Sequence, residues 1–441
     1  MSSEEKGVEM DDKGSISGTG SGGTDSTAIS IVQRGNLKTL EQTLRKQWRL
    51  GQNIVLSWSA DERGLLVIMV PHYFLGNYCA DENQDNEGFI RELISGRRRR
   101  DRDDMFAISK RLEVAPIFIK LSSPLSEEPA VLDAVEQMIC RYGVSYVDSR
   151  AVLLFDIVEF SLFTPFEQAS QLNSLSYSFN SAYNKLASMG IDIEFARTTT
   201  GDGYYVWNKR LGPEANRDLF YFMLLVGADN AVARAASRGN TVPQIRTAYH
   251  VGGHYELYQA AGVNPSVFSY IVGDVTIELA RMLDMAVSEQ ILVGEFDTTI
   301  ADGSLGSQRV PSPAFVSACN RGLEALSGLQ LSSKNLNSIR CQLSEYQDDE
   351  SVRRPRRFLI TDKHGLSRHA YNLQVALDLE GKPLKLGLEE GRLSDAMRAE
   401  AAEPPPSTGE APAGSAATAE ELFDDLAQLL GKRRQGSIVE D

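Results

Sequence analysis

Residues 151–156 read AVLLFD, a run of five apolar residues that ends at Asp156. A short apolar run of this kind predicts a buried β-strand. Upstream, a helix is expected over residues 130–141, because apolar residues recur there at helical spacing: Val131, Leu132, Val135, Met138 and Ile139. Downstream, a second helix is expected from another apolar stripe, formed by Leu172, Leu175, Phe179, Tyr183 and Leu186. The strand at 151–156 is therefore expected to be central to the domain.

The segments that follow alternate between strand and helix patterns. A Gly-Asp-Gly turn at residues 201–203 separates two predicted strands, 191–195 and 204–207. Beyond them the pattern predicts a helix at 216–237, strands at 245–251 and 267–272, a helix at 275–285 and a strand at 291–293. The order βαββαβ with further αβ units predicts an α+β fold, a ferredoxin-like sheet with helices covering one face.

Composition divides the remaining chain. Residues 1–28 contain almost no apolar side chains and are expected to be a disordered tail, and residues 30–144 an α+β N-terminal region with a hairpin. The main domain is expected over 145–300. Residues 301–390 are expected to hold an irregular, partly helical insertion at 302–357 and closing strands at 358–388.

The C-terminal residues are expected to form a tethered helix. Residues 391–417 have the composition of a flexible linker, and 418–441 that of a short amphipathic helix and tail, opened by a capping box at Thr418 and Glu421. Docking of this helix on the protein's own core and binding to a protein partner both remain open.

Charge and apolar content exclude several classes of protein. The formal net charge of −15 and the pI near 5.0 argue against nucleic-acid binding. The basic run Arg97–Arg100 is followed at once by aspartates, which favours a solvated, self-neutralising loop over a binding patch. The four cysteines show no C-x-x-C spacing. No signal peptide is evident and the longest apolar run, 219–228, is too short to span a bilayer, so we expect a cytoplasmic protein.

Two aspartates are the candidate chemical groups. Asp156 ends one predicted strand, and Asp202 lies in the turn between two others. If adjacent strands bring them together, the two carboxylates repel unless a cation lies between them. Ligation by oxygen alone suits Mg²⁺ or Mn²⁺ bound also by substrate phosphates. The pair therefore indicates a phosphoryl-transfer site, although aspartate is also common in turns for its own backbone hydrogen bonds.

Several segments, in this order, resemble those of the class III nucleotidyl cyclases, the adenylate and guanylate cyclase family. FDIVEFS at 155–161 resembles the metal-binding start of the family, TTGDGY at 199–204 its second metal motif, and RTAYHVG at 246–252 its central strand. YIVGD at 270–274 with LARML at 279–283 resembles the helix that carries the transition-state arginine, and QILV at 290–293 the strand after it. The resemblance covers about a third of the chain.

The resemblance implies a cyclase catalytic domain that works as a head-to-tail homodimer on a nucleoside triphosphate. Each site would take its metal ligands from one subunit and its arginine from the other. Two Mg²⁺ or Mn²⁺ ions would be held by Asp156, Asp202 and the Ile157 carbonyl, and Arg281 would stabilise the charge that develops at phosphorus.

The resemblance also implies the groups that bind substrate. Backbone amides from Val158 to Ser161, with Phe160 between them, are expected at the start of a helix, where they would hold the β and γ phosphates. Thr198 and Tyr270 take the base-reading positions. Lys363 is a candidate triphosphate ligand, with a solvated loop lysine as its alternative.

Three positions depart from the family pattern. Thr198 and Tyr270 stand where purine cyclases carry a lysine and an aspartate, which suggests an altered base preference that includes pyrimidines. Ile277 replaces an asparagine that orients the ribose, and isoleucine offers neither a donor nor an acceptor. A catalytically degenerate domain that binds a nucleotide or a partner therefore remains an alternative, as does an unrelated α+β binding protein.

His250 and His254 are four residues apart, a spacing that suits a metal site only on a helix. The local pattern is a strand that leads into a turn. Structural histidines are therefore favoured over zinc ligands.

Overall fold

The computed structural model describes residues 29–80, 85–262, 264–302, 306–331, 333–347, 352–361, 367–389 and 392. The chain divides into two compact units, Met1–Arg398 and Ala399–Asp441, and every described residue belongs to the first. The predicted tail at 1–28, the linker at 391–417 apart from Arg392, the C-terminal helix at 418–441 and Lys363 lie outside the described residues.

The N-terminal region contains a small antiparallel sheet in the order β1-β2-β3. The elements are α1 (Ile31–Trp48), η1 (Arg49–Gly51), β1 (Asn53–Asp61), β2 (Gly64–Pro71), α2 (His72–Cys79), α3 (Asn86–Ile94), α4 (Arg102–Leu112), β3 (Ile117–Lys120) and α5 (Pro129–Arg141). Alternate residues of β1 enter two separate cores, one shared with α1 and α5 and one with α3 and α4. Helices therefore cover both faces of this sheet.

The basic run at Arg97–Arg100 corrects the sequence prediction at one position. Arg98 is fully buried, and its guanidinium donates to the carbonyls of Val55 and Val144 and, at 2.9 Å, to the Ser145 hydroxyl. A buried cation is tolerated where several acceptors satisfy its donors. The prediction of a fully solvated loop is therefore wrong for Arg98.

The second part of the chain forms an eleven-stranded sheet whose main path is β12-β13-β17-β9-β7-β4-β6-β5. Its first elements are β4 (Ser145–Ile157), η2 (Phe160–Leu162), α6 (Pro165–Ser188), β5 (Phe195–Thr199), β6 (Gly203–Asn208), α7 (Pro213–Ala236), β7 (Ile245–Ala261), β8 (Asn264–Val272), α8 (Asp274–Met285) and β9 (Ile291–Gly294). They are followed by β10 (Asp297–Asp302), β11 (Gly306–Pro311), α9 (Ser312–Gly322), η3 (Leu323–Leu326), β12 (Gln330–Leu331), β13 (Lys334–Leu343), β14 (Glu345–Gln347), β15 (Arg353–Pro355), β16 (Arg357–Thr361), β17 (Ser367–Leu379) and β18 (Lys382–Leu386).

Strand β4 lies at the centre of this sheet, antiparallel to both β7 and β6. Its pairing with β7 runs from Ser145 to Ile157 and is shifted by an irregularity between Val147 and Arg150. Five consecutive residues of β4, Ala151–Phe155, are buried, because both faces of the strand are covered.

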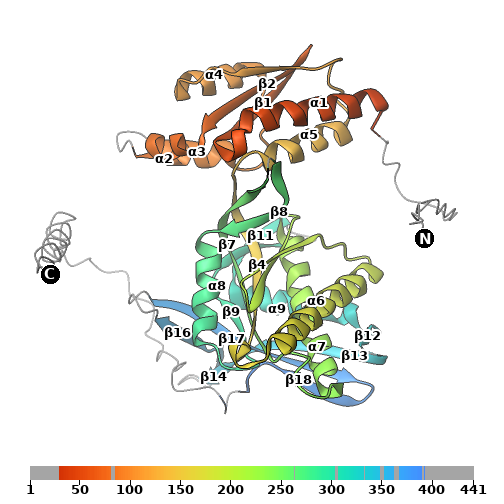
Figure 1. The fold of residues 1–441 in the computed structure, drawn as a ribbon. Coiled ribbons are helices and arrows are strands. Elements are labelled where there is room, and N and C mark those ends of the chain that lie inside the picture. The colour runs from red at the N-terminus through yellow and green to blue at the C-terminus, as the bar shows by residue number, and fades with distance from the viewer. Residues whose placement is uncertain are drawn as a thin grey trace, which may run out of the picture. The chain divides into compact units, whose positions relative to one another are not determined.

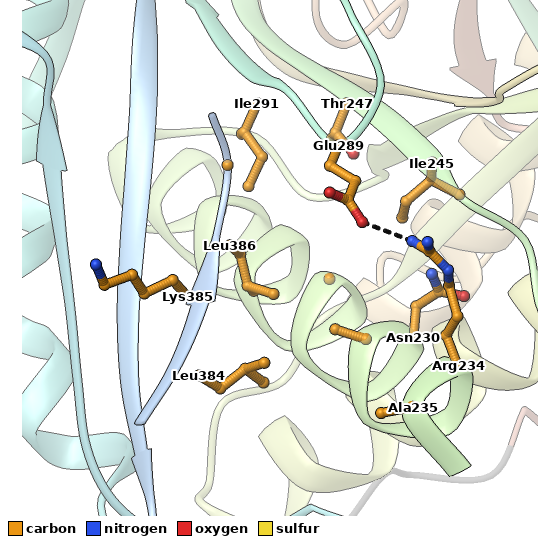
Figure 2. Close-up of a pocket in the computed structure, with 13 residues that line it drawn as sticks. Asn230, Arg234, Ala235, Ile245, Thr247, Glu289, Ile291, Leu384, Lys385 and Leu386 are labelled. Atoms are coloured by element: carbon orange, nitrogen blue, oxygen red, sulfur yellow. Dashed lines mark hydrogen bonds and ion pairs between the residues drawn. The ribbon is translucent and has the colours of Figure 1, made fainter. Parts of the chain in front are cut away.

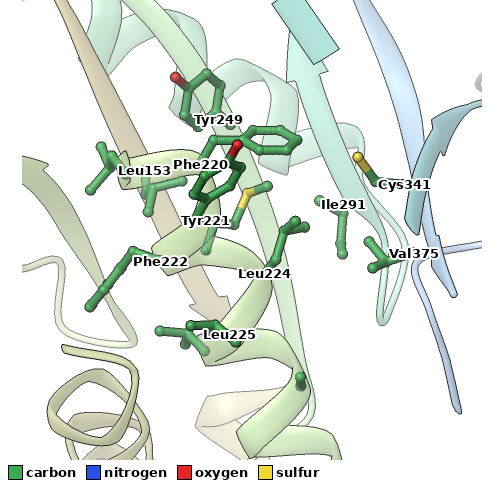
Figure 3. Close-up of a cluster of buried hydrophobic side chains, with 14 of the residues drawn as sticks. Leu153, Phe220, Tyr221, Phe222, Leu224, Leu225, Tyr249, Ile291, Cys341 and Val375 are labelled. Atoms are coloured by element: carbon green, nitrogen blue, oxygen red, sulfur yellow. The ribbon is translucent and has the colours of Figure 1, made fainter. Parts of the chain in front are cut away.

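The two faces of β4 enter different cores, which corrects the prediction that helices cover only one face. Leu153 and Phe155 pack with α6, α7 and α9, whereas Val152 and Leu154 pack with α8. Figure 3 shows Leu153 beside side chains of α7. Figure 1 shows α8 on one side of the sheet and α6 and α7 on the other. The apolar residues of α8 at Val275, Leu279, Met282 and Leu283 form the stripe that requires this second cover.

Two other predictions need correction. The strand expected at 191–195 begins only at Phe195, because its partner strand β6 ends at Asn208, which pairs with Phe195. The expected irregular insertion at 302–357 contains β13, which pairs with β17 in the main sheet. Leu336, Ile339, Cys341 and Leu343 point from β13 into the core, although polar residues between them hide the strand pattern.

Helix α7 is the central helix of the larger core. By length and composition, α7 is the one helix among the described residues that could cross a membrane. Within the fold, 61% of its most apolar 18-residue stretch is buried. Its side chains Phe220, Phe222, Leu224 and Leu225 pack against the sheet and α6 (Figure 3).

Candidate active site

The two candidate aspartates meet at one end of β4. Asp156 pairs in register with Gly203 on β6 and with Arg246 on β7. The Ile157 amide donates to the Asp202 carbonyl at 3.0 Å, which ties the Gly-Asp-Gly turn to the end of β4. The strands therefore bring both aspartates to the same edge, as the sequence led us to expect.

Glycine is required on both sides of Asp202. A Cβ at Gly203 would lie 2.0 Å from the Phe155 carbonyl oxygen, so only glycine allows the turn to approach β4 this closely. Gly201 has φ +106°, a left-handed conformation that side chains disfavour. These two residues hold the Asp202 backbone against β4.

Asp156 is nearly buried and Asp202 is exposed. The Asp156 side chain is 14% exposed, and burial raises the pKa of its carboxyl. Arg246 opposes this rise, whereas the negative charges of Asp202 and Asp284 add to it. Asp202 accepts a hydrogen bond from the Thr200 hydroxyl at 3.1 Å. The site thus concentrates negative charge around one desolvated carboxylate.

Arg246 is the residue whose role the sequence did not reveal. Its Nε lies 2.6 Å from Asp156 Oδ2, and its Nη1 donates to the Ala286 carbonyl at 2.9 Å. The residue belongs to the RTAYHVG segment, but its place opposite Asp156 follows from the pairing of β4 with β7. That register was the one signal that would have identified it.

The donor set fits a divalent cation. Among the described residues no group of three or more His, Cys, Asp or Glu side chains is arranged to hold a metal ion. Asp156, Asp202 and the Ile157 carbonyl nevertheless offer only oxygen, the donor that Mg²⁺ and Mn²⁺ prefer. Burial is the main cause of the raised pKa of Asp156, and the nearby charge of Asp202 adds to it, so a positive charge is favoured here. Arg246 already supplies one.

The predicted phosphate-binding helix terminus is wrong in part. The Val158 amide donates to the Gln244 carbonyl at 2.9 Å, and α6 begins only at Pro165, after the Thr164 N-cap. Phe160 and Ser161 lie instead in the short turn η2, where Phe160 packs against the core and Ser161 is exposed. The capping box of Thr164 and Glu167 fixes the start of α6 at Pro165, which is beyond the expected segment 158–161.

The three departures from the family pattern lie on β5, β8 and α8. Thr198 pairs with Tyr205, whose hydroxyl donates to the Thr276 carbonyl of α8 at 3.0 Å. Tyr270 pairs with Leu257 on β7, and strands β5 and β8 are in contact. Ile277 is 46% exposed on α8.

Arg281 lies on α8 and pairs with Asp284 one turn later, at 3.4 Å. The charge of Asp284 acts on Asp156, so the last turn of α8 lies near the aspartate site. Helix α8, which carries the predicted Arg281, therefore covers the face of the sheet to which Asp156 belongs.

His250 and His254 are buried on β7. Burial lowers the pKa of each to about 4, with neighbouring arginines lowering it further. The two rings are consequently neutral at physiological pH, and the His250 ring packs edge-on against Phe296.

Comparisons with known proteins give a distant likeness. No family model matches the chain, and no curated protein matches it in sequence. Solved structures similar to it are catalytic domains of adenylyl and guanylyl cyclases. They include the guanylate cyclase domain of RhGC from Catenaria anguillulae in complex with GTP, with 15% identity, 38% of this chain and 96% of that chain covered, and a TM-score of 0.28. The adenylyl cyclase CyaB from P. aeruginosa has 12% identity and a TM-score of 0.27, with 38% of this chain and 94% of that chain covered. The guanylyl cyclase Cya2 has 12% identity and a TM-score of 0.29, with 52% of this chain and 92% of that chain covered.

Proposed function

We propose that the domain from residue 145 onward is a class III-type nucleotide cyclase. It would convert a nucleoside triphosphate into a 3′,5′-cyclic nucleotide and pyrophosphate for intracellular signalling, as a cytoplasmic homodimer. The observation that carries this proposal is the register that sets Asp156 beside the Asp202 turn at one end of β4. The order β7-β4-β6-β5, with α6 and α7 as its crossovers, supports a ferredoxin-like interpretation of this sheet.

Each charged side chain has a separate task in this proposal. Asp156 and Asp202, with the Ile157 carbonyl, would hold two Mg²⁺ or Mn²⁺ ions. Bound metal supplies Lewis-acid stabilisation of the triphosphate oxygens and activation of the attacking 3′-hydroxyl. Arg281 of the other subunit would stabilise charge on the transferring phosphoryl group.

The remaining site residues would set substrate binding and choice. Phe160 and Ser161 would border the triphosphate, and Lys363, outside the described residues, stays a candidate ligand. Thr198 and Tyr270 would select the base. Neither is charged, which is why the base remains open between purines and pyrimidines.

The decisive experiment measures cyclic product. Purified full-length protein is incubated with ATP, GTP, CTP or UTP in the presence of Mn²⁺, and products are separated by chromatography and mass. We expect product from at least one triphosphate and none from Asp156→Ala or Arg281→Ala. Asp192→Ala, at an aspartate whose side chain is 71% exposed on a loop, is the matched control and should retain activity.

The head-to-tail dimer has its own test. If each site takes aspartates from one subunit and Arg281 from the other, mixing inactive Asp156→Ala with inactive Arg281→Ala regenerates one intact site per mixed dimer. Random exchange of subunits should then restore about a quarter of wild-type activity. No recovery after verified exchange would contradict a shared site.

A second candidate is a degenerate cyclase domain that binds nucleotide or a partner without turnover. Two observations favour it: Arg246 occupies one oxygen of Asp156, and Ile277 stands where a ribose-orienting asparagine is expected. Retained nucleotide binding, measured by calorimetry, with no product from any of the four triphosphates would select this candidate over the enzyme.

A further inference from the structure

A groove of about 610 Å³ is lined by α1 on one side and by the hairpin that joins β7 to β8 on the other. The α1 residues that line it follow the spacing i, i+3, i+4 and i+7, so they share one face of the helix: Lys38, Glu41, Gln42 and Arg45. Strand β8 also contacts α5 and η1, so the hairpin lies against the N-terminal region. The volume of this α1 groove lies within the range of small-molecule sites, which are common between two parts of a chain.

Most of the charged residues that line the α1 groove are cations. They are Lys38 and Arg45 of α1 and Arg141 at the end of α5, against a single carboxylate, Glu41. The Glu41 carboxylate lies 3.4 Å from the Arg141 guanidinium. Lys38 is exposed and makes no hydrogen bond or ion pair with another described residue. The groove therefore offers a lysine that no described carboxylate neutralises.

The position of Lys38 has no explanation in the helix itself. Arg45 belongs to the last turn of α1 and Arg141 to the last turn of α5, where the free carbonyls of a helix end favour cations. Lys38 lies in the middle of α1, away from both ends. Helix α1 carries four cations and one carboxylate, in a chain whose formal net charge is −15. Positive charge at this groove is thus a local feature of an acidic protein.

A second cavity, of about 420 Å³ beside β18, is different because its cations are paired (Figure 2). Its Arg234 lies 2.6 Å from Glu289, which lines the same cavity. Its other cation, Lys385, points away from the cavity and lies 2.7 Å from Glu389. That cavity therefore does not attract an anion. The α1 groove differs from it by the unpaired ammonium group of Lys38.

The hairpin side of the α1 groove presents an aromatic ring. Phe268 is 79% exposed and lines the groove. The Ser266 hydroxyl donates to the Phe268 carbonyl at 2.6 Å, which restrains the backbone beside this ring. An exposed phenyl ring gains contact area when a flat ring of a ligand packs against it.

We infer that the α1 groove is a binding site for a small organic phosphate with a flat ring, whose phosphate lies at Lys38, Arg45 and Arg141 and whose ring packs on Phe268. Near neutral pH a phosphate monoester carries a charge of about −2 and three acceptor oxygens, more of each than a carboxylate offers. Lysine and arginine both bind phosphate oxygens through charge-assisted hydrogen bonds. The site uses neither predicted metal-binding aspartate, so the inference does not rest on the proposed cyclase activity.

Binding is measured by isothermal titration calorimetry of the full-length protein with 1-naphthyl phosphate. Metal-free buffer keeps the aspartate site from binding the phosphate through a metal ion. We expect a single class of site with an affinity at least about tenfold higher than for 1-naphthoate or inorganic phosphate. Equal affinity for 1-naphthoate would overturn the choice of phosphate, and equal affinity for inorganic phosphate would overturn the role of the ring. Absence of saturable binding would overturn the site.

Two lysines of α1 test the position of the phosphate. Lys38→Gln should weaken binding of 1-naphthyl phosphate about tenfold, because it removes a charge-assisted hydrogen bond. Lys46→Gln, at an exposed lysine of the same helix that does not line the groove, is the matched control. It should change the affinity by less than about twofold, since solvent screens a charge outside the site. Equal losses in the two variants, with unchanged melting temperatures, would mean that only the general charge of α1 attracts the probe.

Glu41→Gln should strengthen binding, which a damaged fold cannot do. The Glu41 side chain is 48% exposed, so its replacement should leave α1 folded. The change removes the carboxylate that lines the groove and opposes a phosphate. We expect the affinity for 1-naphthyl phosphate to rise about threefold at low salt and less at high salt. Unchanged or weaker binding would contradict the placement of the phosphate.

The ring is tested by a pair of exposed phenylalanines. Phe268→Ala should weaken binding of 1-naphthyl phosphate about fivefold and leave the affinity for inorganic phosphate unchanged, because only the ring contact is lost. Phe166→Ala, at a phenylalanine of α6 that is 77% exposed, is the matched control and should alter neither affinity. Full affinity in Phe268→Ala would show that the hairpin is not part of the site and would overturn the two-sided groove.

Discussion

Strands β4 and β7 carry two arginine–carboxylate pairs that resemble each other in geometry and differ in their electrostatics. Toward one end, Arg150 Nη1 lies 2.9 Å from Glu256 Oε2, with side chains 5% and 15% exposed. At the other end, Arg246 Nε lies 2.6 Å from Asp156 Oδ2, with side chains 29% and 14% exposed. Distance and burial alone do not distinguish a structural pair from a candidate site.

The pKa of each carboxyl distinguishes them. Burial acts to raise the pKa of Glu256, but Arg150, Ser269 and His254 outweigh it and the pKa is lowered. Burial is the largest influence on Asp156 and raises its pKa; Arg246 lowers the pKa but does not offset burial, and the charges of Asp202 and Asp284 raise it further. The Glu256 pair is balanced by its own neighbours. The Asp156 pair has an excess of negative charge that an added cation would balance.

The largest expected effect separates the two carboxylates by activity. Asp156→Asn should reduce cyclic product formation about a thousandfold, equivalent to about 4 kcal/mol of transition-state stabilisation. Glu256→Gln, the matched control on the neighbouring strand, should keep the rate per folded molecule within about threefold. Comparable losses in both variants, measured with the same triphosphate and Mn²⁺, would remove the distinction between the pairs.

The effects on stability should have the opposite order, with Glu256→Gln more destabilising than Asp156→Asn. Glu256→Gln leaves the Arg150 guanidinium buried without its charged partner, and breaking such a pair costs about 3 kcal/mol. Urea unfolding followed by circular dichroism measures the change. Replacing both partners together, Arg150→Met with Glu256→Leu, should cost less than the single change, because no lone charge stays buried. A more damaging double variant would show that the pair stabilises the fold on balance.

Arg246→Gln tests whether the arginine competes with metal. Removing the guanidinium frees Asp156 Oδ2 and removes a positive charge beside the predicted metal ligands. Mn²⁺ affinity measured by calorimetry should rise about tenfold, equivalent to about 1.4 kcal/mol. Weaker binding would mean that Arg246 chiefly positions the carboxylate.

The smallest expected effect is the pH dependence of stability, and its sign differs between the pairs. Asp156 binds its proton more tightly in the folded protein than in the unfolded chain. Its protonation therefore adds to the free energy of unfolding below the unfolded pKa, and this contribution is lost as pH rises through the raised folded pKa. Glu256 contributes above its unfolded pKa and loses that contribution as pH falls through its lowered folded pKa. In metal-free buffer, Asp156→Asn should therefore gain on the wild type as pH rises, and Glu256→Gln should gain on it as pH falls. Urea midpoints across the acidic range measure both trends.

Local patterns were enough to predict the central elements. The run Ala151–Phe155 and the glycines at 201 and 203 are strong signals because each acts within a few residues. They placed Asp156 and Asp202 at strand ends, and the register of β4 with β6 joined them. The ends of these strands could be predicted because an apolar run or a glycine-rich turn marks each of them.

What the sequence concealed depends on pairing between distant segments. Arg246 lies opposite Asp156 although 90 residues separate them, and no local pattern reports that register. The Val158 amide is taken by Gln244 from another strand. Arg98 resembled a solvated cation because its acceptors, the carbonyls of Val55 and Val144, are backbone groups that composition does not show. β13 was missed because its outward side chains are polar.

The continuity of β4 has a consequence for how such a chain can be recombined. Ser145, at the start of the strand, accepts a hydrogen bond from Arg98 of the N-terminal region, and Asp156 lies eleven residues further along the same strand. Since side chains alternate between faces, a junction that adds or deletes one residue would reverse the faces on its two sides, so that the Arg98–Ser145 and Asp156–Arg246 contacts would no longer form together. A graft of another N-terminal region would have to keep the alternation of side chains along β4 in step across the junction. Otherwise the added or deleted residue would have to lie at the irregularity between Val147 and Arg150. That short segment is the natural splice point for a chimera.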